Sequence, residues 1–160
     1  MPLNSVQLLV KSTLDGLQFP ITEQGTLTAY IAPPNPDNID GPIVHIWGGV
    51  SDEKRRTMTR PVGNKSISYE IDLWIYFAEE LDDSLSDSLF PVILDTIALK
   101  LRTMTMPLTI TDPNTGVSSN IVSIGEDMKT DYAPARTNTN QSFMIYMARM
   151  VLDIDEWVTG

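Results

Sequence analysis

The sequence predicts an α+β fold: an antiparallel or mixed sheet of about four main strands, two flanking helices, an extra hairpin and a long projecting arm. The first observation is the segment 66–77, where apolar residues occupy every second position, as they do on one face of a strand. The second is the segment 88–103, where apolar residues recur four positions apart, as on one face of a helix. The third is the order of the segments, because successive strands without intervening helices favour antiparallel pairing. With 160 residues we expect a single domain over 1–160.

The N-terminal part predicts one helix and two strands. Residues 5–17 have apolar residues at helical spacing, and Asn4 or Ser5 can cap the helix. A short strand is expected over 26–32, before a loop that holds three prolines, and a second strand over 43–47, before two glycines.

The segment 50–64 is polar and basic, and it predicts either a long hairpin loop or an extended β-arm. Five of the eleven basic residues fall within twelve positions: Lys54, Arg55, Arg56, Arg60 and Lys65. We interpret the segment as an arm that docks on an acidic surface of a neighbouring subunit, because an arginine can bind carboxylates with two parallel hydrogen bonds. The candidate interface residues are Lys54, Arg55, Arg56 and Arg60. A solvated hairpin and a contact with DNA are the alternatives.

The C-terminal half predicts a helix, a hairpin and a last strand. An acidic connection over 79–87 leads to the helix over 88–103, with Ser86 or Ser88 as its N-cap and Pro91 in its first turn. Short strands are expected over 107–111 and 117–124, followed by a polar segment over 126–141. The last strand, over 142–153, is apolar at both odd and even positions, which predicts a central strand covered on both faces.

Composition excludes several classes of protein. The net charge is −10, so electrostatic repulsion opposes general binding to nucleic acid. The chain has no cysteine, which excludes disulfides, thiolate zinc sites and cysteine nucleophiles. It lacks an apolar run long enough for a bilayer and the pattern of a secretory signal, and we expect no membrane partner.

The residues give little support to catalysis. A Ser-His-Asp arrangement would need His45, the one histidine, whose position in a strand favours a polar residue on the exposed face. Asp37, Asn38 and Asp40 do not have the spacing of an EF-hand. Asp72 is either a buried acid or, as we expect, lies on the less covered face beside Glu70. We therefore predict no catalytic residue, no cofactor and no metal ion, and not an enzyme.

Two runs of residues resemble a known family. Tyr69-Glu-Ile-Asp-Leu-Trp-Ile-Tyr-Phe77, then an acidic gap, then Leu89-Phe-Pro-Val-Ile-Leu-Asp-Thr-Ile-Ala-Leu-Lys-Leu-Arg102 look like the tail terminator (tail completion) proteins of long-tailed bacteriophages. The surrounding layout is also similar, with a leading helix, a long arm before the main strand, and a hairpin and long strand after the helix.

The resemblance implies an α+β fold and a structural role in the virion, in the tail or neck, after assembly in the host cytoplasm. Such proteins form a ring, commonly a hexamer, on top of the tail tube. The ring stops polymerisation of the tail-tube protein and gives a joining surface to the neck or head-closure protein. DNA would pass through the lumen without specific binding, which agrees in sign with the acidic chain.

Two alternatives differ in class from a terminator. One is a neck, head-closure or tail-tube protein of a phage, with a similar layout. The other is a small enzyme or ligand-binding domain that uses carboxylates and His45, which would need a pocket with convergent polar groups.

Overall fold

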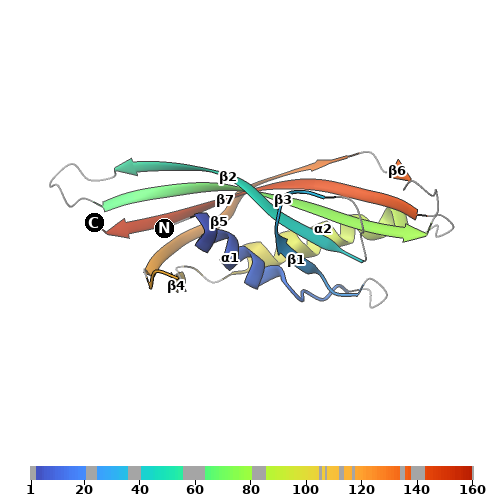
Figure 1. The fold of residues 1–160 in the computed structure, drawn as a ribbon, viewed down its shortest axis with the longest axis horizontal. Coiled ribbons are helices and arrows are strands. Elements are labelled where there is room, and N and C mark those ends of the chain that lie inside the picture. The colour runs from blue at the N-terminus through green and yellow to red at the C-terminus, as the bar shows by residue number, and fades with distance from the viewer. Residues whose placement is uncertain are drawn as a thin grey trace.

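The computed structural model shows two helices and a seven-stranded mixed sheet (Figure 1). The strand order is β1-β2-β3-β7-β5-β4, and β6 pairs with β7. The sheet is mixed because β1 and β2 are parallel, whereas the other pairs are antiparallel. The elements are α1 (Leu3–Leu14), β1 (Thr28–Ile31), β2 (Ile43–Arg55), β3 (Asn64–Glu80), α2 (Ser86–Arg102), β4 (Leu108–Thr111), β5 (Ser118–Tyr132), β6 (Arg136–Thr137) and β7 (Phe143–Thr159). The structure describes residues 3–20, 25–35, 41–55, 64–80, 86–104, 106, 108–111, 114–116, 118–133, 136–137 and 143–159.

The antiparallel pair of β3 and β7 forms the centre of the sheet. Each strand has 17 residues, and they pair from Asn64 with Thr159 to Glu80 with Phe143. Figure 1 shows the two strands side by side along the length of the molecule. The sequence predicted both strands, but over shorter ranges, 66–77 and 142–153. The observed β3 extends further at both ends, and β7 extends further at its C-terminal end. Polar residues at the strand ends hide the alternation there, while their backbone groups still pair across the ladder.

Both helices cover the same face of the sheet, which forms a two-layer structure (Figure 1). Alternate residues of the central strands enter one core with the apolar sides of α1 and α2. In β3 these are Tyr69, Ile71, Leu73, Ile75 and Phe77, and in β7 they are Tyr146, Ala148, Met150, Leu152 and Ile154. Each of these β3 residues pairs with one of these β7 residues. The residues between them therefore place their side chains on the opposite face of the sheet.

Several boundaries correct the predictions. The sheet has more strands than the four main strands and one hairpin expected. β7 is central, as predicted, but it is covered on one face only, because its odd-numbered residues from Ile145 to Trp157 are half-buried. The polar residues 126–132 belong to β5, although we expected no strand there. α2 begins at Ser86, which places Pro91 inside the helix and beyond its first turn.

The described part of the predicted arm is a continuation of the sheet. β2 extends to Arg55, which pairs with Lys65, and β3 begins at Asn64. β7 lies on the other side of this part of β3. We call the paired residues 53–55 and 64–67 together the β-arm. From residue 50 to Arg55 the predicted arm is therefore an extended β-strand and not a loop. Residues 56–63 lie outside the described part.

Two glycines allow irregularities in the strands. The register of β2 shifts between Trp47 and Val50, and Gly48 has a φ of 73°. The register of β5 shifts between Ile124 and Met128, and Gly125 has a φ of 65°. A Cβ atom at Gly125 would lie 2.9 Å from Cδ1 of Leu152 and 3.0 Å from Sδ of Met128. Glycine at this bulge thus meets both a backbone and a packing requirement.

We expect Gly125→Ala to destabilise the fold more than Gly116→Ala. Both positions have a positive φ, which costs an alanine about 1 kcal/mol. Gly116 has no atom near its Cβ position, whereas Gly125 is packed against Leu152, so Gly125→Ala should lose about 1–3 kcal/mol more. Urea unfolding followed by circular dichroism measures both losses. Equal losses for the two variants would contradict the packing argument.

A buried acid lies in the covered layer. Glu156 is 1% exposed, and the Tyr69 hydroxyl donates a hydrogen bond to its Oε2 at 2.8 Å. We expect Tyr69→Phe to lower the free energy of unfolding by about 1.5–3 kcal/mol, because a buried carboxylate loses a donor. Tyr30→Phe is the control, since Tyr30 is largely exposed, and should change stability by less than about 0.5 kcal/mol. A Tyr69→Phe variant as stable as the control in urea unfolding would show that the hydrogen bond contributes little.

Candidate functional site

The face of the sheet opposite the helices is the candidate functional surface, and we call it the open face. Its side chains come from four adjacent strands, and most of those described are half-buried or exposed, while Tyr76 and Ile43 at one end of the face are buried. The register places them in rows across the sheet, so that residues far apart in sequence lie side by side. The residues used below are His45, Trp47, Ser68, Glu70, Asp72, Trp74, Ser123, Lys129, Asp131, Arg149, Val151, Asp153 and Asp155.

An ion pair lies in the middle of the open face. Nη2 of Arg149 donates to Oδ2 of Asp72 at 2.8 Å, and the guanidinium carbon lies 5.6 Å from the centre of the Trp74 ring. Trp47 pairs with Asp72 in the register and is 44% exposed. The Cβ position of Gly48 lies 3.3 Å from Oδ2 of Asp72, so the glycine also leaves room for this carboxylate. These four residues, one arginine, one carboxylate and two tryptophans, are neighbours on the open face.

Acidic residues occupy the two rows between this cluster and the β-arm. Asp155 accepts hydrogen bonds from the hydroxyls of Ser68 on one neighbouring strand and Ser123 on the other. In the next row Glu70 pairs with Asp153 in the register, and Glu70 is exposed. With Asp72 and Asp131, the described side chains of the open face include five carboxylates and two basic groups, those of Arg149 and Lys129, so this described part is negative.

His45 does not form part of a catalytic arrangement among the described residues. Its Nδ1 lies 2.8 Å from the Pro33 carbonyl oxygen, which accepts a hydrogen bond from it. Its ring lies against Tyr30 and Tyr76, with centroids 5.8 Å and 5.6 Å away. The side chain is half-buried on the open face, where the sequence placed it. Within the described part of the chain no carboxylate or serine hydroxyl is hydrogen-bonded to the imidazole, as a triad would require.

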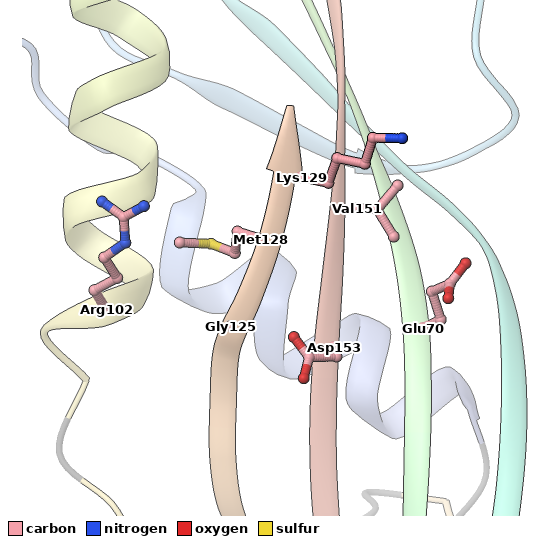
Figure 2. Close-up of a pocket in the computed structure, with 7 residues that line it drawn as sticks. All are labelled: Glu70, Arg102, Gly125, Met128, Lys129, Val151 and Asp153. Atoms are coloured by element: carbon pink, nitrogen blue, oxygen red, sulfur yellow. The ribbon is translucent and has the colours of Figure 1, made fainter. Parts of the chain in front are cut away.

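A pocket of about 570 Å³ lies at the β5 bulge, lined by Glu70, Arg102, Gly125, Met128, Lys129, Val151 and Asp153. In Figure 2 Met128 points toward α2, which carries Arg102, while Lys129 and Glu70 point to the other side of the picture. The charged ends do not converge on one point, as a ligand site would need.

The described residues contain neither a metal-binding cluster nor a membrane-spanning helix. No group of three or more acidic or histidine side chains there could hold a metal ion. No helix in these ranges has the length and apolar character to cross a membrane.

Of the four candidate interface residues, Lys54 and Arg55 lie at the described end of the β-arm. Lys54 pairs with Ser66 and Arg55 with Lys65. Arg56 and Arg60 lie outside the described residues, as do Asp37, Asn38 and Asp40. The structure thus places Lys54, Arg55 and Lys65 together in the backbone ladder.

Sequence reasoning missed the cluster of Arg149, Trp47 and Trp74. Arg149 lies in a strand that we expected to be covered on both faces, so we did not predict a functional role for its charged side chain. Arg149, Asp153 and Asp155 all fall on odd positions, opposite to Met150 and Leu152, and this alternation could have revealed an open face.

The chain matches no protein-family model, and the search of curated proteins returns no match. The open face and the β-arm are the features of the described fold that bear on its function.

We expect a measurable coupling between Asp72 and Arg149. A double-mutant cycle with Asp72→Ala and Arg149→Ala should give about 1–2 kcal/mol, because the pair is partly buried and hydrogen-bonded. Lys129 and Asp131 form the matched control, since they are 3.9 Å apart with side chains 78% and 55% exposed. Their cycle should give at most about 0.5 kcal/mol. Equal coupling energies in urea unfolding would rule out a special role for the central pair.

Proposed function

We propose that the protein is a structural virion protein that caps the tail tube of a long-tailed bacteriophage as a ring and provides the joining surface to the head or neck. The observation that carries this proposal is the combination of an open sheet face with a β-arm that ends in basic residues. A subunit of a ring needs two different surfaces that fit each other, one for each neighbour.

The charges of the chain suit this role. The open face carries more carboxylates than basic groups, and the basic residues gather at the end of the β-arm. Opposite charges on two patches of one subunit favour contacts between copies and disfavour contact of like patches. An acidic ring would also pass DNA without holding it.

The resemblance noted in the sequence falls on the central elements. Residues 69–77 lie in β3, and residues 89–102 lie in α2, which packs over the covered face. These runs build the scaffold that positions the open face and the β-arm. The described pocket at the β5 bulge does not favour the enzyme alternative, because its charged groups diverge.

The oligomeric state tests the proposal. Negative-stain electron microscopy and light scattering should show rings, either for the protein alone or after addition of tail tubes assembled from the tube protein of the same genome. A protein that stays monomeric in both conditions would overturn the proposal. Long cylinders formed by the protein alone would instead favour a tail-tube protein.

We expect the basic residues of the β-arm to be needed for assembly. Lys54→Glu combined with Arg55→Glu should raise the concentration needed for rings at least tenfold, since two attractive contacts become repulsive. Lys100→Glu combined with Arg102→Glu makes the same change of charge at exposed positions of α2. Rings that form equally well with both double variants, at equal folded content by circular dichroism, would show that the β-arm has no part in assembly.

A further inference from the structure

We infer that the open face of one copy receives the basic end of the β-arm of a second copy, and that this contact repeats head to tail. The acceptor is the surface around Trp47, Glu70, Asp72 and Arg149, and the donor is the end of the β-arm at Lys54, Arg55 and Lys65. The inference rests on the proposed ring and names the surface that closes it.

Charge complementarity identifies the occupant. Residues 54–65 contain five basic residues and no acidic one, while all 21 acidic residues of the chain lie elsewhere. The open face presents the exposed Glu70 and, beside it, Asp153 and Asp155 in the rows nearest the β-arm. The two surfaces attract each other, and attraction of this kind steers the encounter and fixes which patches meet.

The β-arm of the same chain cannot make this contact through its described residues. Arg55 pairs with Lys65 at the end of the ladder, and Glu70 lies five residues further along β3. At the rise of an antiparallel strand this separation is about 17 Å along a continuous ladder. The ladder holds positions 55 and 70 of one chain apart, so the proposed contact between them is made with another copy.

The acceptor surface also has residues suited to an interface. Trp47 is 44% exposed, and Arg149 is held between Asp72 and the Trp74 ring. Tryptophan and arginine are enriched among the residues that dominate binding energy at interfaces. The aliphatic stems of lysine and arginine side chains can cover an exposed indole while their charged ends reach carboxylates nearby. The face therefore offers both an apolar anchor and charge partners to a basic strand pair.

The symmetry of this contact agrees with a ring. The β-arm and the open face are different patches, so each copy uses one patch toward each neighbour. Such a heterologous contact closes into a ring when the rotation between copies allows it. A contact between two open faces would instead give a closed dimer and would bring like charges together.

Cross-linking tests the contact directly, because the natural chain has no cysteine. Chains with Arg55→Cys are mixed with chains that carry Glu70→Cys, under the conditions where the wild-type protein forms rings, and treated with a short bismaleimide. We expect a cross-linked dimer in the mixture. Chains with Leu99→Cys replace the Glu70→Cys chains in the control, since Leu99 is 60% exposed on α2. Cross-linking no greater than in this control would overturn the inference.

Charge exchange tests the same contact without a cross-linker. Glu70→Lys should raise the concentration needed for rings about tenfold, which corresponds to about 1.4 kcal/mol. Adding Arg55→Glu to the same chain should restore part of the assembly, because the contact between positions 55 and 70 then has opposite charges again. Asp95→Lys, an equal change at an exposed position of α2, should leave assembly unchanged. A loss that Arg55→Glu does not restore would count against the pairing of these two patches.

The outcomes separate this inference from the proposed function. The wild-type protein could form rings on tail tubes while the mixture of Arg55→Cys and Glu70→Cys chains shows no cross-link above the control. This result would overturn the inference and leave the proposed function standing. A wild-type protein that stays monomeric with and without tubes would overturn both.

Discussion

The pairing of β3 with β7 over 17 residues is the constraint on which the rest of the structure depends. The strict alternation of side chains along this pair puts the large apolar residues on one face, where α1 and α2 bury them. The same alternation forces the intervening residues onto the other face. A shift of the register by one residue would exchange the two faces, so the burial of the core also fixes the position of every side chain on the open face.

The open face is held in place by contacts within the sheet. The ion pair of Arg149 with Asp72, the packing of the guanidinium on Trp74 and the hydrogen bonds of two serines to Asp155 join three neighbouring strands. A surface that is already ordered loses less conformational entropy when a partner binds. The β-arm continues the ladders of β2 and β3, so its basic end is positioned by the same central pairing. Both features would favour the proposed assembly, because its contacts depend on the relative placement of two patches.

The sequence predicted the parts of the fold whose pattern is local. Alternation over 66–77 predicted β3, the spacing of apolar residues predicted both helices, and the single histidine was placed correctly on the less covered face. The polar end of β5 was missed, because pairing with β7 stabilises a strand whose own residues have no apolar alternation. The bulges at Gly48 and Gly125 also interrupt the two-residue period. The ion pair of Asp72 with Arg149 joins residues 77 positions apart, so only the register brings them together. The sequence alone did not locate the acidic surface proposed to receive the arm, because the carboxylates of the open face come from different strands.

A density map of the assembled particle tests the central claim most directly. Cryo-electron microscopy of the protein bound to tail tubes should show a closed ring in which the β-arm of each copy lies on the open face of the next. The density should place Arg55 of one copy near Glu70 of its neighbour. A ring joined through the helices, with every open face left in solvent, would contradict the account.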